Sequence, residues 1–372
     1  MSIRHAAQPQ FPLRGLREGP AAPWVRPADW PGLPWIPAED QARVGLVAVN
    51  DTDNEAVAVL CAGAYTVDWG DGSSLQNVAT GVKAEHVYNY AALTSKITSR
   101  GYKTAIVKIT PQAGQNLTTI NLQQRPAGFQ ALNSQGSLWL DIQINAANVT
   151  TLTLGGTTIK HASIERLHIR SHACTTLNAL CQGFSSLRSL PSFDTANVTS
   201  VYNMMSDCAA LQEAPFFDFQ NATASYNTFA GCISLGFLHP YNLSKSTSIY
   251  NFANACYSLR KFPQIVLGPS ADSRSFVQNC SGLREVDAID LSQATNLGNA
   301  FVGAVTLTRI KAVGMKVTFT LASCSLSATA LNEVFTNLAS GVTGQTITVT
   351  GNPGAATCDT SIATAKGWTV VT

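Results

Sequence analysis

Six leucines recur at a constant interval of 24 residues in the second half of the chain: Leu187, Leu211, Leu235, Leu259, Leu283 and Leu307. Four cysteines keep the same interval: Cys208, Cys232, Cys256 and Cys280. A fixed interval of this length is typical of a solenoid, in which each repeat buries its apolar face against the next. The pattern therefore predicts a stack of similar coils, an architecture that mostly binds partners or serves as a scaffold.

Each repeat carries a short L-x-x-L segment, followed by Asp or Asn and by Ser or Thr. Asp194, Asp218, Asn242 and Asp290 share one register, which suits turn positions. We expect one short strand per repeat. Stacked strands lie roughly 4.8 Å apart, so six coils would extend about 30 Å. The regular repeats occupy residues 184–310.

The cysteines of the ladder are predicted to be reduced and buried. A free cysteine packs as a small hydrophobe, and solenoid repeats place Cys or Asn at one buried position of each coil. A redox role or a metal role is the alternative. The chain has no C-x-x-C pair, which argues against a structural zinc site.

We assign residues 113–325 to the solenoid and residues 326–372 to a C-terminal cap of mixed α/β structure. Residues 113 to 180 carry short apolar alternation at irregular spacing and are interpreted as degenerate early coils. In the cap, Ser327–Ser340 has helical periodicity and Gly341 stops the helix. A strand at QTITVTG, a short helix around Asp359–Lys366 and a last strand at Trp368–Thr372 complete it.

Residues 1–42 hold eight of the 16 prolines and three of the six tryptophans. Such a proline density excludes helix and sheet interiors and favours an extended arm. Linkers are poor in aromatic residues, whereas Trp24, Trp30 and Trp35 alternate with proline here. The composition therefore predicts an arm that docks onto another protein through these three tryptophans, with a disordered linker as the alternative.

Residues 43–112 are predicted to form a small β-sandwich, with strands at RVGLVAV, AVAVLC, AYTVDW, EHVYNY and TAIVKIT. Turns are expected at Asn50–Asn54 and at Gly70-Asp71-Gly72. Asp68 and Asp71 are potential calcium ligands. The simpler interpretation, which we favour, is that Asp71-Gly72 closes a hairpin.

Three segments resemble known families. TVDWGDGSS followed by EHVYNY resembles the hallmark of polycystic-kidney-disease-type (PKD) immunoglobulin-like domains, which are structural modules of extracellular and virion proteins. Phe184 to Met205 resembles the leucine-rich repeats of bacterial surface adhesins, and similar repeats occur in structural proteins of tailed bacteriophages. The string TGNPGAATCDTSIATAKGWTV resembles a C-terminal cap of phage and surface-repeat proteins. Together the resemblances imply a protein of a virion or of a cell surface.

Composition narrows the function classes. Charged residues make up 12% of the chain and the net charge is +2 without a basic cluster, so nucleic acid is not an expected partner. No apolar run reaches the length of a membrane span, so no membrane insertion is expected. The first residues lack the apolar region of a secretory signal, which disfavours an exported adhesin and favours a phage protein assembled in the host cytoplasm.

Few residues suggest chemistry. His168, His172 and Cys174 are spaced so that they would lie on one face of a strand, where they could bind a metal. We prefer the interpretation that the histidines lie at the edge of a solenoid coil. Asp194 and Asp218 are candidates for a glycosidase pair, but they fit better as turn residues. Tyr202, Tyr226 and Tyr250 each precede an asparagine at the 24-residue interval. This column is either a sugar- or protein-binding face or a purely structural ladder.

The sequence thus predicts a mainly β protein: an extended arm, an Ig/PKD-like β-sandwich, and a leucine-rich-repeat solenoid with an α/β cap. The predicted function is that of a non-enzymatic phage virion protein, namely a tail fibre, baseplate or tail-decorating protein, which binds other virion proteins through its arm. It would form a homo-oligomer, contact a host-surface glycan or protein, and need no cofactor or metal. The alternatives are a capsid decoration or head fibre protein, a bacterial cell-surface adhesin, and a glycan-degrading tailspike.

Overall fold

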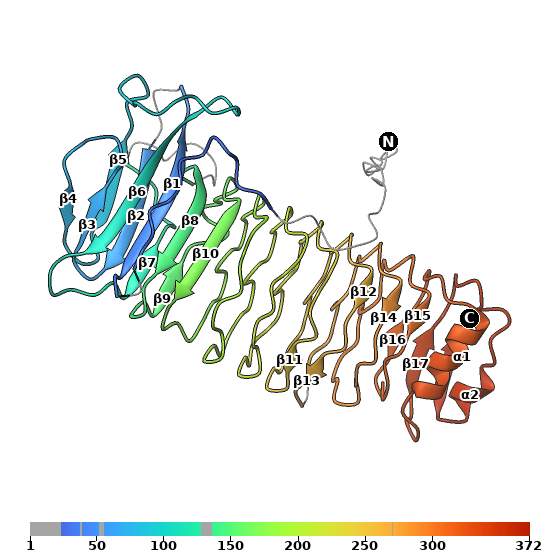
Figure 1. Cartoon of the computed structure of the whole chain (residues 1–372). Helices are drawn as coiled ribbons and strands as arrows, with labels where there is room; N and C mark the ends of the chain where they lie inside the picture. Colours follow the sequence, from blue (N-terminus) through green and yellow to red (C-terminus); the bar gives the residue numbers. More distant parts are fainter. Residues whose placement is uncertain (1–23, 38, 52–55, 128–135, 270) are drawn as a thin grey trace, which may run out of the picture.

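The computed structural model describes residues 24–37, 39–51, 56–127, 136–269 and 271–372. The chain is an elongated, mainly β structure with about nine solenoid turns and only 4% helix. A sandwich of two sheets lies at one end, the solenoid turns follow in a row, and a small α/β cap closes the other end (Figure 1). The predicted mainly β fold with a solenoid is confirmed.

The sandwich is built from six strands: β1 (Ala42–Val49), β2 (Ala56–Ala62), β3 (Tyr65–Asp68), β4 (Gln76–Val78), β5 (Lys83–Val87) and β6 (Lys103–Pro111). All the predicted strands of this region are present, although the one at EHVYNY starts earlier and ends at Val87. Strand β4 has only three residues, and the sequence pattern does not predict it. β3 and β4 pair antiparallel, so the loop with Asp71 and Gly72 closes a hairpin, as predicted.

Both sheets of the sandwich continue past residue 112 into the solenoid. Strands β7 (Thr119–Asn121), β8 (Trp139–Asn145), β9 (Thr151–Thr153) and β10 (Arg166–Ser171) extend them. One sheet has the order β10-β8-β1-β6-β3-β4 and the other β5-β2-β7-β9. β8 pairs antiparallel with β1 but parallel with β10. It is therefore the strand at which the antiparallel sandwich becomes a parallel solenoid, and one apolar core runs through both.

Further along, the coils are joined by bonds that repeat from turn to turn. The N–H of Asn203 donates to the carbonyl of Tyr226, and the N–H of Asn227 donates to that of Tyr250. The strands are short because each coil bends after two residues: β11 (Asn242–Leu243), β12 (Lys261–Phe262), β13 (Val266–Leu267), β14 (Glu285–Val286), β15 (Arg309–Ile310) and β16 (Phe319–Thr320). The pairs between successive coils are parallel, as one strand per repeat requires.

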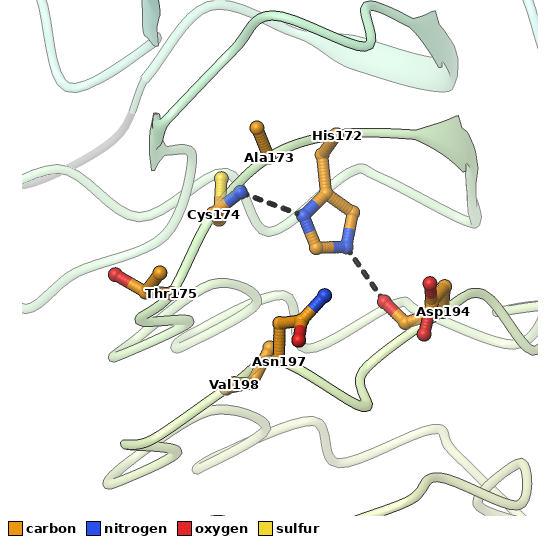
Figure 2. A pocket seen from close by; sticks show the side chains of 7 residues that line it. All are labelled: His172, Ala173, Cys174, Thr175, Asp194, Asn197 and Val198. Atoms are coloured by element: carbon orange, nitrogen blue, oxygen red, sulfur yellow. Dashed lines mark hydrogen bonds between the residues drawn. The ribbon is translucent and has the colours of Figure 1, made fainter.

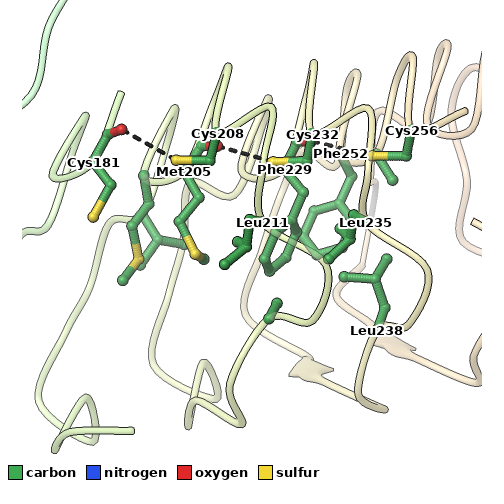
Figure 3. Close-up of a cluster of buried hydrophobic side chains, with 14 of the residues drawn as sticks. Cys181, Met205, Cys208, Leu211, Phe229, Cys232, Leu235, Leu238, Phe252 and Cys256 are labelled. Carbon is green, nitrogen blue, oxygen red and sulfur yellow. Dashed lines mark hydrogen bonds between the residues drawn. The ribbon is translucent and has the colours of Figure 1, made fainter. Parts of the chain in front are cut away.

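In the interior of the solenoid, side chains at equivalent positions of successive coils form columns, which Figure 3 shows from the side. The leucines of the 24-residue ladder are all fully buried. The rings of Phe229 and Phe252 stand edge to face between successive coils, and so do those of Phe276 and Phe301. The thiol of Cys232 donates to the carbonyl of Met205 at 3.1 Å, and that of Cys256 to Phe229 at 3.2 Å. The packing role predicted for the cysteines is confirmed, because each thiol binds the coil before its own.

The asparagines that follow the tyrosine column have a conformational role. Asn203, Asn227 and Asn251 have φ values of 55°, 55° and 53°, in the left-handed region. Apart from glycine, asparagine is among the residues that adopt this region most readily. The column therefore marks a sharp corner of each coil, which explains why the residue type recurs.

The cap covers the last coils. Helix α1 (Ala328–Asn337) starts at Ser327, whose hydroxyl accepts the N–H of Ala330, and its buried face includes Leu331, Val334 and Phe335. Strands β17 (Gln345–Thr348) and β18 (Trp368–Val371) continue the parallel pairing from β16, and helix α2 (Ser361–Thr364) lies between them in sequence. The predicted helices and strands of the cap are thus present, α2 being shorter than expected.

Of the predicted N-terminal arm, residues 1–23 and 38 lie outside the described residues. Residues 24–37 run without helix or strand across the outer face of β1, β6 and β8, and Arg170 of β10 donates a hydrogen bond to the carbonyl of Ile36. We call this segment the strap. It explains why all eight residues of β1 are buried: Val47 and Val49 face the sandwich core, whereas Leu46 and Ala48 face the strap.

Candidate functional site

The structure forms a hollow of about 460 Å³ where the regular repeats begin. It is lined by residues of two successive coils: His172, Ala173, Cys174, Thr175, Asp194, Asn197 and Val198. The first four follow β10, and the last three belong to the first regular repeat (Figure 2). The volume falls within the range of small-molecule sites, so this hollow is the candidate binding site.

His172 holds the two coils of the hollow apart. Its Nε2–H donates to the carbonyl oxygen of Asp194 at 2.8 Å, and its Nδ1 accepts the N–H of Cys174 at 3.0 Å. In Figure 2 the ring stands between the two chain segments. Burial lowers the pKa of His172 and outweighs the opposing effect of Asp194. The side chain is therefore a neutral spacer whose two nitrogens are both used.

Two other polar side chains of the hollow are free to bind a ligand. Asp194 uses Oδ1 to accept the N–H of Ala196 at 2.9 Å, which leaves Oδ2 without a protein partner among the described residues. Asn197 is exposed, and its amide has no hydrogen bond within the described part of the chain. The lining contains one carboxylate and no lysine or arginine.

One coil further on, the equivalent position is closed. Asn221, which corresponds to Asn197, donates from Nδ2 to the carbonyl of Ala196 at 2.7 Å, and its Oδ1 accepts from Lys245 at 2.6 Å. The Asn197 amide lacks such bonds because the imidazole of His172 occupies the space between the coils. The hollow thus lies where the Asn197 amide has no bond of the kind that Asn221 makes one coil further on.

The metal hypothesis for His168, His172 and Cys174 has no geometric support. Both nitrogens of His172 already have backbone partners, and Cys174 donates its thiol to the carbonyl of Val149. Burial raises the pKa of the Cys174 thiol to about 11, which opposes the thiolate that a metal needs. Among the residues that the structure describes, no group of three His, Cys, Asp or Glu side chains could hold a metal ion.

The tyrosine column lies outside the hollow. The rings of Tyr202 and Tyr226 stack at 5.0 Å with 3° between their planes. Tyr250 is stacked instead with the guanidinium of Arg274, 5.1 Å from the ring centre. The facing surfaces of Tyr202 and Tyr226 therefore contact each other, and their edges remain for any partner.

The three tryptophans of the strap have different environments. Trp30 is 4% exposed, packs on Leu46 and Leu140, and donates to the hydroxyl of Tyr102. Trp24 donates to Glu165. Trp35 is 72% exposed.

In the described structure Trp24 and Trp30 thus contact their own chain, whereas the docking prediction had all three contacting a partner. The strap is also held by charge, because Arg26 donates to the buried carboxylate of Asp141 at 2.8 Å. Only Trp35 is available to a partner without rearrangement.

The proposed calcium ligands of the sandwich are engaged elsewhere. Asp71 accepts from Ser73 through Oδ1 and from His86 through Oδ2 at 2.6 Å, and Asp68 accepts the N–H of Gly70. The imidazole of His86 stacks on Trp69 with ring centres 5.2 Å apart. These contacts explain why the sequence places Trp-Gly-Asp before a His-x-Tyr strand.

No model of a protein family matches the chain, and no curated protein matches it. In the described part of the chain, neither helix is long enough to cross a membrane.

Sequence reasoning missed the hollow. The sequence indicates a turn position for Asp194 and an edge position for His172, and the signal that could have found the hollow is the loss of the 24-residue interval upstream of Phe184.

Proposed function

We propose that this chain is a non-enzymatic structural protein of a tailed-bacteriophage particle, a tail fibre, baseplate or tail-decorating protein. The observation that carries the proposal is the continuous core through sandwich, solenoid and cap, which makes the chain a stiff rod. Repeated polar side chains contribute to the stacking of coils: the Thr199 and Thr223 hydroxyls each donate to a carbonyl of the preceding coil. Such a rod suits a spacer or scaffold.

The finer assignments of the fold belong to the same proposal. We infer that residues 43–112 form an Ig-like domain of the PKD type, supported by the contacts of Trp69, Asp71 and His86. We infer that the repeats are leucine-rich repeats of the adhesin type, supported by the buried leucine and cysteine columns. Trp35 is one part that we propose to bind other virion proteins. The other is residues 1–23, which lie outside the described residues.

Mass spectrometry and cryo-electron microscopy of purified particles from the source culture test the proposal. We expect the chain in the particle, in several symmetric copies, with the region around Trp35 against another virion protein. Absence from particles together with presence on intact cells would contradict it and support a cell-surface adhesin. Density on the head would replace the tail location with that of a decoration or head fibre protein.

A further inference from the structure

The geometry points to a binding site for a single pyranose sugar in the hollow between His172 and Asn197. This inference concerns the isolated chain and stands independently of the virion proposal. It starts from the difference between Asn197 and Asn221, which occupy equivalent positions of two successive coils. A coil that repeated the next one would bury the Asn197 amide against the preceding coil, as Asn221 is bonded to Ala196. The His172 ring prevents this and leaves a space of about 460 Å³.

The groups around this space select the class of ligand. Asp194 offers a free carboxylate oxygen, which accepts hydrogen bonds, and the Asn197 amide can both donate and accept. The hydroxyls of a sugar ring can likewise both donate and accept hydrogen bonds. Ala173, which is exposed, supplies a small apolar surface for the C–H face of the ring.

Other ligand classes fit less well. The lining has a carboxylate and no cationic side chain, so it would repel phosphate and other anions. It provides a single carboxylate and no cluster of metal ligands in the described chain, so a divalent cation would be poorly held. One carboxylate is also fewer than the two that glycoside hydrolysis ordinarily uses, so the site would bind a sugar without cleaving it.

The rigidity of the site comes from its surroundings. His172 is fixed at both nitrogens and contacts Phe193 edge to face at 5.5 Å. Asp194 is fixed by its own turn with Ala196. A sugar would therefore enter a preformed hollow, although few polar contacts make the affinity for one sugar unit weak. Repetition of the chain in an assembly would raise the effective affinity for a glycan.

Saturation-transfer NMR on the purified full chain tests the inference, with methyl α-glucopyranoside, methyl α-galactopyranoside, methyl α-mannopyranoside and N-acetylglucosamine as probes. We expect at least one probe to bind with millimolar affinity, and glycerol, which has no ring, not to bind. Asn197→Ala removes an amide with no structural partner, so it should weaken binding about tenfold and leave the melting temperature unchanged.

Two variants make the test specific. Asp194→Asn retains an oxygen for the Ala196 N–H but loses the anionic acceptor, and it should also weaken binding. Asn221→Ala is the matched control one coil away: it should lower the melting temperature and leave sugar binding unchanged. The inference is overturned if no pyranoside binds, if glycerol binds equally well, or if Asn197→Ala and Asp194→Asn bind like the wild type.

Discussion

At the scale of single residues, the repeat positions are explained by the backbone conformation and burial of each column. The asparagine after each tyrosine lies in the left-handed region, and the cysteine of each repeat lies between two coils. The sequence revealed both columns, but it could not show that the asparagine is selected for its φ value. Only the backbone dihedral angles of the structure show that reason.

A substitution at Asn227 tests the conformational role. Asn227→Val places a β-branched residue at a φ of 55°, so we expect the free energy of unfolding to fall by about 1–3 kcal/mol. Asn227→Gly should cost a few tenths of a kcal/mol at most, because glycine accepts this region. Urea denaturation measures both, and equal losses in the two variants would show that the amide contacts matter instead.

The burial of the cysteines predicts their reactivity. Eight of the nine are buried and Cys358 is partly exposed. Burial raises the pKa of the Cys232 thiol to about 12, so almost no thiolate forms at pH 8. A thiol reagent at pH 8 should therefore modify at most Cys358 in the folded chain and all nine in urea. Rapid modification of ladder cysteines without urea, in a Cys358→Ser variant, would contradict this.

At the scale of elements, the strap is the part that the sequence placed least well. Its tryptophans are predicted to bind a partner, and in the structure two of them contact residues of their own chain that are far away in the sequence. The prolines correctly excluded regular structure. They carried no information about which surface the segment would cover.

Two tryptophans of the strap form a matched pair. Trp30→Ala should lower the free energy of unfolding by about 3–5 kcal/mol, because the ring fills the space above Leu46 and Leu140. Trp35→Ala should cost about 1 kcal/mol or less, since it loses an exposed stacking contact with Arg170. Thermal or urea denaturation distinguishes them, and a similar small loss in both would mean that the strap does not pack on β1 in solution.

The loop between β3 and β4 predicts a pH effect. Burial alone would raise the pKa of Asp71, but the hydrogen bonds from Ser73 and His86 outweigh it and the pKa is lowered. A carboxyl group with a depressed folded pKa stabilises above its unfolded pKa, near 3.9, and this stability is lost as the pH falls through the folded value. The stability difference between wild type and Asp71→Asn should be present at pH 7 and shrink below about pH 4. Chemical denaturation across pH measures it, and a constant difference would exclude this linkage.

At the scale of the whole molecule, sandwich and solenoid share one core. The sequence suggested a boundary near residue 112, where the spacing of strands changes. The sheets cross that point through β7 and β8. A change of sequence pattern therefore marks a change from antiparallel to parallel pairing, without a gap in the packing.

The shared core predicts cooperative unfolding. Five of the six tryptophans lie at or before residue 139, and Trp368 lies in the cap. Within a Trp368→Phe variant, whose remaining tryptophans lie at or before residue 139, we expect tryptophan fluorescence and far-ultraviolet circular dichroism to report the same urea midpoint. Leu235→Ala, in the middle of the solenoid, should shift both together. Separate midpoints would show that the sandwich and the solenoid unfold independently.

The sequence alone determined the coil period, the inward-facing columns, the hairpin at Asp71 and the capping helix. Each of these depends on neighbours within one coil or on a repeat of the same environment. Only the tertiary structure decided where the strap lies, how the sheets cross residue 112 and where the hollow opens. These features join residues far apart in the chain, such as Trp24 and Glu165, which are 141 positions apart. Such contacts depend on the shape of two finished surfaces, and that shape leaves no local pattern in the sequence.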